Sequence, residues 1–294
     1  MGRAAEGVVP RRERVMETTA SSPTTRATEL LQRPRYEVIP LDGVEEQVLA
    51  HVPREVTVTV TVSPTKGLEP TLALAGALAG HGYSVVPHLS ARLVSGAGEV
   101  AEIAERLRGD GVGDVFVVAG DAEVPSGSLH GAIDLLEALE ELGRPFAEVG
   151  ITGYPESHPL IDDATTIAAM FEKARHATYI VSQVCFDPAV TAQWIEAVWA
   201  RGTRLPIHVG IPGAVSRAKL LRVSTRIGIG DSMRFLRKNG SFAGRFFRGF
   251  DPDRLIEGLG EVLAGEKVGG FHVFTFNDLE DTEAWRQRRL VPTA

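Results

Sequence analysis

The stretch Asp114–Pro125, DVFVVAGDAEVP, decides the fold. Largely apolar residues that favour β-structure lead directly into an Ala-Gly-Asp turn, which is the pattern of a buried parallel strand ending at a polar loop. Asp121 would then lie at the carboxyl end of this strand. Its carboxylate could belong to a functional site, or it could cap the helix predicted over Leu129–Leu142, and this stretch alone supports both interpretations equally.

The same strand-then-helix pattern recurs along most of the chain. Further strands are predicted at Tyr36–Pro40, Val56–Val62, Ser84–Leu89, Glu148–Tyr154, Tyr179–Val184, Pro206–Ile211 and Gly270–Phe276. Helical patterns lie between them at Thr71–Gly80, Glu99–Arg108, Asp163–Ala177, Ala189–Arg201 and Asp253–Ala264. Alternating strands and helices predict a parallel sheet. Eight such units predict a (β/α)8 TIM barrel, and no glycine-rich dinucleotide motif follows the first strand to favour an open sheet.

The ends of the chain lack this regular pattern. Residues 1–35 are rich in arginine, serine and threonine without a sustained apolar period, which predicts a flexible N-terminal extension. Residues 36–294 are predicted to form one catalytic domain. Two extra short helices are expected within Ser216–Asn239, before the last unit, and the polar tail after Asn277 is expected to be loop.

Composition narrows the class of protein. A net charge of −7 and a pI near 5.7 argue against nucleic acid or an anionic membrane as the main partner. The longest apolar runs are too short to span a bilayer. The single cysteine, Cys185, cannot form an internal disulfide, and the histidines lack metal-binding spacing, so no metal site is predicted. We expect a cytoplasmic protein that acts on small molecules, and a homo-oligomer is compatible with the sequence.

Polar side chains gather at the predicted carboxyl ends of the strands, where TIM-barrel active sites form. They are Glu37, Thr61, His88, Asp121, Tyr154, His158, Gln183, Asp187, Thr275 and Asn277. Helix capping alone would explain about half of these positions. An acid inside a strand, however, is unusual unless it is paired or faces a solvated cavity, so Glu37 favours a functional role.

Six segments contain these strand ends: YEVIP at Tyr36–Pro40, VVPHLS at Val85–Ser90, VVAGDA at Val117–Ala122, TGYPESHP at Thr152–Pro159, SQVCFD at Ser182–Asp187 and FHVFTFN at Phe271–Asn277. Together, in this order, they resemble methylenetetrahydrofolate reductase. The resemblance implies a (β/α)8 barrel that reduces 5,10-methylenetetrahydrofolate to 5-methyltetrahydrofolate, in most members through a bound flavin.

The resemblance also implies residue roles. Glu37 and Asp121 match the family's catalytic acids. Folate contacts are implied for Gln183, Asp121, Asp187, Thr275 and Asn277. The cofactor site is implied to include Thr61, His88, Gly120, Tyr154 and His158.

Several positions depart from the flavin-binding members. Ala119 stands where the family has an arginine, and about Thr165 and Glu172 replace the acid and lysine that hold the flavin. Asp278 replaces a cation after the last strand, at a position where the resemblance implies contact with the folate's anionic tail. The sequence therefore resembles the flavin-independent branch known among actinobacteria, in which NADH or NADPH passes hydride directly to the folate, and FAD binding is expected to be weak or absent. An FAD-dependent reductase and a non-catalytic folate-binding barrel remain alternatives.

Overall fold

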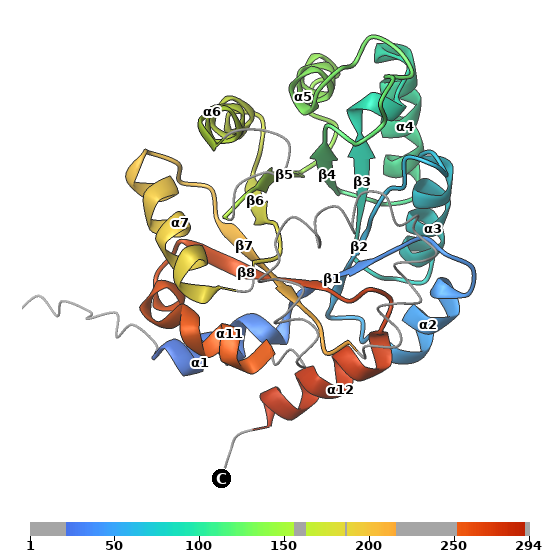
Figure 1. Cartoon of the computed structure of the whole chain (residues 1–294). Coiled ribbons are helices and arrows are strands. Elements are labelled where there is room, and N and C mark those ends of the chain that lie inside the picture. The colour runs from blue at the N-terminus through green and yellow to red at the C-terminus, as the bar shows by residue number, and fades with distance from the viewer. Residues whose placement is uncertain (1–21, 156–162, 186, 216–251, 292–294) are drawn as a thin grey trace, which may run out of the picture.

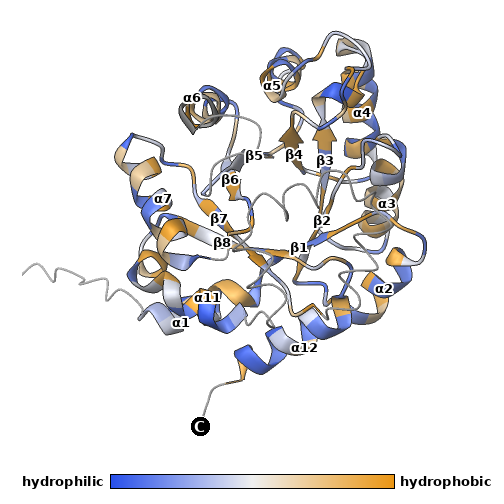
Figure 2. Cartoon of the chain, in the orientation of Figure 1, coloured by the Kyte–Doolittle hydropathy of each residue, from blue (hydrophilic) through white to orange (hydrophobic). Residues whose placement is uncertain are grey.

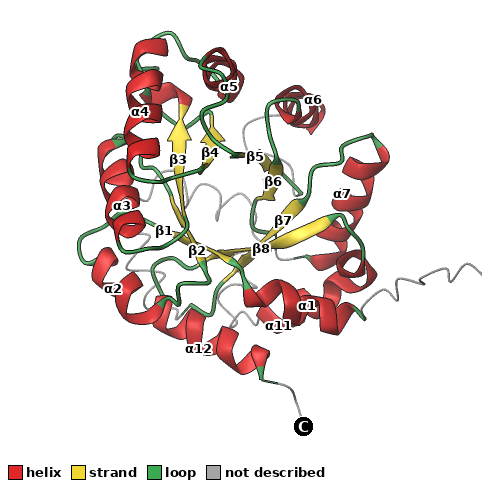
Figure 3. Cartoon of the chain, turned by 180° about the vertical axis from the view of Figure 1, so that it is seen from behind, coloured by secondary structure: helices red, strands yellow, loops and turns green. Residues whose placement is uncertain are grey.

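A closed barrel of parallel strands forms the centre of the protein, with helices around it (Figure 1). The computed structural model describes residues 22–155, 163–185, 187–215 and 252–291. Eight strands follow one another around the barrel in sequence order, and β1 pairs with β8 to close it. The predicted (β/α)8 architecture is confirmed, and the view from behind shows the helices outside the ring of strands (Figure 3).

Each predicted strand is present within two residues of its expected bounds. The strands are β1 (Arg35–Val38), β2 (Thr57–Val60), β3 (Val85–Ser90), β4 (Asp114–Val118), β5 (Glu148–Gly153), β6 (Tyr179–Ser182), β7 (Ile207–Pro212) and β8 (Val268–Phe274). The described helices are α1 (Pro23–Gln32), α2 (Val44–His51), α3 (Glu69–Gly80), η1 (Ala91–Leu93), α4 (Ala97–Gly109), α5 (Ala132–Glu141), α6 (Asp163–Ala174), α7 (Pro188–Ala200), α11 (Pro252–Leu259), η2 (Gly260–Ala264) and α12 (Leu279–Leu290).

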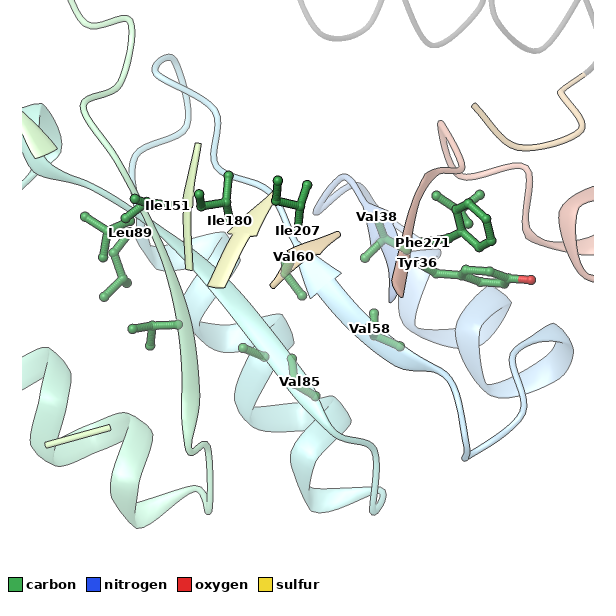
Figure 4. Close-up of a cluster of buried hydrophobic side chains, with 14 of the residues drawn as sticks. Tyr36, Val38, Val58, Val60, Val85, Leu89, Ile151, Ile180, Ile207 and Phe271 are labelled. Atoms are coloured by element: carbon green, nitrogen blue, oxygen red, sulfur yellow. The ribbon is translucent and has the colours of Figure 1, made fainter. Parts of the chain in front are cut away.

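Alternate residues of each strand face opposite sides of the barrel wall. Ile151, Ile180 and Ile207 are register neighbours on β5, β6 and β7 and point to one side (Figure 4). They belong to the large apolar cluster that packs the helices onto the strands. A smaller cluster that includes Phe116 and Tyr179 lies on the opposite face, inside the barrel. The strands are therefore largely apolar, whereas many helical residues facing away from them are polar (Figure 2).

A buried polar cluster closes the amino end of the barrel. The guanidinium of Arg35 donates to Asp114 at 2.8 Å and lies 4.2 Å from the centre of the Tyr179 ring, and the Tyr179 hydroxyl donates to Asp114 at 2.7 Å. These three residues each begin a strand. The opposite charges of Arg35 and Asp114 neutralise each other, so these polar groups can fill the amino end of the barrel. The opposite, carboxyl end carries the candidate site.

Part of the segment predicted to be a flexible extension, residues 1–35, is helical. Helix α1 occupies Pro23–Gln32, is capped by Ser22, and contacts α11, α12, η2 and β8. Leu31 on this helix is fully buried. Only a few apolar residues of α1 make contact, so its sequence carries a weak periodic signal, and tertiary packing rather than propensity stabilises it. Residues 1–21 lie outside the described residues.

The C-terminal tail, predicted as loop, contains helix α12. Trp285 and Arg286 on this helix are buried although most of its residues are polar. The expected helices within Ser216–Asn239 lie outside the described residues. Helices α1, α11 and α12 lie side by side in both views, so the two ends of the described chain meet on one side of the barrel (Figures 1 and 3).

Candidate functional site

Glu37 lies between two imidazoles inside the barrel. One oxygen of its carboxylate, Oε2, is 3.1 Å from Nε2 of His272 and 3.8 Å from Nε2 of His88. The strand register explains this grouping, because Glu37 pairs with Phe274, two residues after His272, and alternation along β8 puts all three on the interior face. His88 reaches the same group from β3, with its ring 4.7 Å from that of Phe116.

Burial and charge act in opposite directions on this acid. Burial raises the pKa of Glu37. The hydrogen bond with His272 and the electrostatic interactions with His88 and His272 lower it by more, so the net pKa lies below the ordinary value. Burial also lowers the pKa of His88 to about 4, although the nearby Glu37 opposes this shift. In the ligand-free protein, hydrogen bonding and charge therefore outweigh burial at Glu37.

Thr275 and Asn277 hold the end of strand β1. The Thr275 hydroxyl donates to the Glu37 carbonyl at 2.5 Å. The side-chain amide of Asn277 makes two hydrogen bonds to Ile39. Its Oδ1 accepts from the Ile39 N–H at 2.8 Å, and its Nδ2 donates to the Ile39 carbonyl at 2.9 Å. Asn277 has a positive φ of 58°. Both residues are far from β1 in the chain, and their hydrogen bonds to Glu37 and Ile39 fix the backbone around the acid.

The loop after β4 presents Asp121 at the carboxyl end of the barrel. Its side chain is exposed. Burial raises the pKa of the nearby Tyr154, a hydrogen bond with Thr152 opposes this shift, and the negative charge of Asp121 adds to it. Gly120 precedes it with a φ of 89°, and a Cβ there would lie 1.9 Å from the Ser90 hydroxyl. Gly120 is thus required by the turn itself, since only glycine fits both the backbone angle and the close approach.

The remaining predicted residues are more dispersed. Gln183 is exposed just after β6, and its N–H donates to the Gly153 carbonyl at 2.8 Å. Asp187 accepts from the N–H groups of Ala189 and Val190 and so caps helix α7. The Thr61 carbonyl accepts from the Thr71 hydroxyl at 2.9 Å, which links the end of β2 to α3. His158 lies outside the described residues.

The positions expected to hold a flavin carry no cation that faces solvent. Ala119 and Glu172 are both exposed. Lys173 is buried, donates to the Thr152 hydroxyl at 3.3 Å, and has a pKa lowered to about 8 by burial. The side chain of Thr165 lies outside the described residues. None of these described side chains offers an exposed positive charge at the positions where the resemblance implies a flavin. Asp278, at the position implied to contact the folate's anionic tail, is buried at the start of α12.

Two contributors to the site were missed in the sequence. His272 lies within the segment FHVFTFN, and counting alternate residues back from Phe274 would have placed it on the same face as Glu37. Arg92 follows β3 and bonds to the loop that carries Asp121. No sequence signal could identify Arg92, because its partners are backbone carbonyls about 30 residues away.

The described residues contain no group of three or more His, Cys, Asp or Glu side chains arranged to hold a metal ion. None of the described helices combines the length and apolar character needed to cross a membrane.

Comparisons with known proteins give a family for the chain and solved structures that share its fold. The profile of the family described as methylenetetrahydrofolate reductase matches residues 44–230, which include strands β2 to β7. A protein from Clostridium thermocellum that binds two copies of 5-methyl-5,6,7,8-tetrahydrofolic acid is 11% identical with a TM-score of 0.57, over 91% of this chain and 100% of that chain. Oxaloacetate acetylhydrolase in complex with 3,3-difluorooxalacetate is 11% identical with a TM-score of 0.50, over 91% of this chain and 86% of that chain. At such identities the two structures share only the barrel fold with this protein. The profile match spans more than half of the sequence, and on that basis the chain belongs to the methylenetetrahydrofolate reductase family.

Proposed function

We propose that this protein reduces 5,10-methylenetetrahydrofolate to 5-methyltetrahydrofolate, with NADH or NADPH giving its hydride directly to the folate. The observation that carries the proposal is the position of Glu37, a largely buried acid between His88 and His272 inside a barrel of this family. An ionisable group of this kind inside a barrel, with shifted pKa values around it, is typical of a site that moves protons.

The reaction needs one proton and one hydride. Opening the five-membered ring of the folate breaks the bond between the methylene carbon and the anilinic nitrogen, which takes the proton, and leaves an iminium ion. Hydride from C4 of the reduced nicotinamide then forms the new C–H bond at the methylene carbon. This yields the methyl group and the oxidised nicotinamide. The protein must hold the two rings at near-attack distance and supply the proton.

Glu37 is the proposed proton donor to the anilinic nitrogen, directly or through a water molecule. In the ligand-free protein its pKa lies below the ordinary value, so the carboxyl group is ionised at neutral pH. Its side chain is still 17% exposed. A bound pterin would cover this remaining surface, and the added burial would raise the pKa and favour the protonated acid. His272 then orients the carboxyl group through their shared hydrogen bond.

Asp121 and Gln183 are the proposed contacts to the pterin. Both side chains are exposed at the carboxyl ends of β4 and β6, where a ligand can reach them. The Asp121 carboxylate would stabilise the positive charge of the iminium ion. Gln183 can donate and accept at once, which suits the edge of a heterocycle.

The proposed independence from flavin rests on the side chains found where the family holds its FAD. Ala119 provides no charge, Glu172 provides a negative one, and the ammonium group of Lys173 is directed to Thr152 in the interior. An acid near a pyrophosphate adds repulsion where a cation would contribute charge-assisted hydrogen bonds.

The test is an anaerobic assay of protein stripped of any flavin, supplied with NADH or NADPH and methylenetetrahydrofolate, with and without added FAD. We expect equal turnover in both conditions. Activity only with FAD would identify the FAD-dependent alternative, and folate binding without nicotinamide oxidation would identify the non-catalytic barrel.

Replacing Glu37 tests the proton donor in the same assay. Glu37→Gln should lower turnover by roughly 10²-fold or more, because the amide keeps the shape of the side chain but cannot donate an acidic proton. Glu69→Gln is the matched control, since Glu69 is an exposed residue that pairs with Arg106 on the outer helices. Near-normal turnover of Glu37→Gln would overturn the assignment.

A further inference from the structure

Arg92 ties the loop after β3 to the loop after β4. Its guanidinium donates from Nε to the Ala122 carbonyl at 2.6 Å, from Nη2 to the Glu123 carbonyl at 2.7 Å and from Nη1 to the His130 carbonyl at 3.3 Å. Its backbone takes part as well, because the Arg92 N–H donates to the Ala119 carbonyl at 3.0 Å and the Arg92 carbonyl accepts from Ser126 at 2.9 Å. One residue therefore holds the segment 119–130 at five points.

These bonds lie on both sides of Asp121. The Ala119 carbonyl, two residues before it, accepts from the Arg92 N–H and also from the Ser90 hydroxyl at 3.3 Å. The Ala122 carbonyl, one residue after it, accepts from the Arg92 side chain. Within the described part of the chain no side-chain hydrogen bond holds the Asp121 carboxylate itself, so the direction of that carboxylate depends on its backbone.

Close packing fixes the far part of the same segment. The Ser128 N–H donates to the Ser95 carbonyl at 3.3 Å, and a Cβ on Gly127 would lie 1.8 Å from that carbonyl oxygen. The two loops are thus in contact along their length.

We propose that Arg92 is a positioning residue, which sets the Asp121 carboxylate for its role at the folate ring. The inference deepens the proposed function and rests on it for the role of Asp121. Arginine is required here because its planar guanidinium offers five N–H donors in a fixed fork, and three separate carbonyls use it. A lysine would keep the charge but could not reach the three acceptors in this geometry.

The first measurement needs no folate. Amide hydrogen exchange over peptides covering 119–131 should be at least about tenfold faster in Arg92→Met and in Arg92→Lys than in the parent protein, because the backbone bonds of Ser126 and Ser128 open more often. Arg106→Met is the matched control, since Arg106 makes two bonds to Glu69 away from this segment and should leave its exchange unchanged. Unchanged exchange in both Arg92 variants would overturn the proposal, and circular dichroism confirms that each variant is folded.

The second measurement is a double-mutant cycle on kcat/KM for the folate. Arg92→Met and Arg92→Lys should each lose at least about tenfold, and Arg92→Met combined with Asp121→Asn should be no worse than Asp121→Asn alone, because Arg92 acts through Asp121. A merely structural role predicts losses that multiply, and that result would overturn the proposal, as would parent-like activity of Arg92→Lys. If the parent protein neither binds nor reduces the folate, the proposed function fails, and the exchange experiment by itself decides whether Arg92 holds the segment.

Discussion

At the scale of single residues, the interior imidazole of His88 makes the protein sensitive to acid. Burial lowers its pKa from the ordinary 6.5 to about 4, so the folded protein keeps this ring neutral where the unfolded chain binds a proton. Its contribution to stability is therefore complete above about pH 6.5 and is lost progressively as the pH falls toward 4. The lowered pKa of Glu37 has the same sign and acts below the ordinary pKa of a glutamate.

We expect His88→Asn to flatten the dependence of unfolding free energy on pH between 6.5 and 4. The parent protein should lose up to roughly 3 kcal/mol across this window from this one group, as one pKa unit corresponds to about 1.4 kcal/mol. Urea unfolding at a series of pH values measures the effect. His81→Asn, at an exposed histidine near Glu45, should leave the parent's slope unchanged. An unchanged slope in His88→Asn would show that the ring is not the titrating group.

At the scale of elements, helix α6 carries a buried cation. The ammonium group of Lys173 reaches the Thr152 hydroxyl, and burial lowers its pKa from 10.5 to about 8. Below about pH 8 the folded protein holds a desolvated charge, and this cost to stability is relieved only as the pH rises from 8 toward 10.5.

We expect Lys173→Met to stabilise the protein at pH 7 by roughly 2–3 kcal/mol, because methionine fills similar space without the buried charge and the lost Thr152 bond offsets little of the gain. The variant should also lose the rise in stability between pH 8 and 10.5. Thermal or urea unfolding tests both statements. Arg175→Met changes an exposed cation near the same helix, bonded to Glu137, and should shift stability by less than about 1 kcal/mol. A destabilised Lys173→Met would mean that the lysine has a stabilising partner.

At the scale of the whole molecule, Arg286 joins the two ends of the described chain. It is fully buried, donates to the carbonyls of Leu31 and Gln32 at the end of α1, and pairs with Glu283 and Glu55. Glu283 in turn accepts from the Tyr36 hydroxyl on β1 at 2.9 Å. The cation thus caps α1 and fixes α12 beside the first strand, next to Glu37.

We expect Arg286→Met to destabilise the protein by roughly 3–5 kcal/mol, since it leaves Glu283 buried without its cation and two helix-end carbonyls without donors. Increased proteolysis near α1 should accompany the loss. Arg289→Met on the same helix removes a partly exposed pair with Asp253 and should cost less than about 1 kcal/mol. Similar losses in the two variants would argue against a special role for the buried network.

The sequence by itself determined the barrel and the strand ends at which the candidate residues lie. Strand-forming runs of the right length alternate with helices, and this local pattern leaves few ways to bury the apolar faces. The fold, all eight strands and the position of Glu37 and Asp121 at strand ends followed from it. In the stretch Asp114–Pro125 only Asp121 was expected to be functional, whereas Asp114 closes the amino end of the barrel with Arg35.

Only the tertiary structure decided which polar residues meet. The pairing of Glu37 with His272, the bonds from Arg92 to the Asp121 loop and the burial of α1 and α12 all join segments far apart in the chain. Such contacts depend on barrel closure and strand register, which no local pattern encodes. The same contacts set the charges and burial around Glu37, so the direction of its pKa shift could be found only in the folded protein.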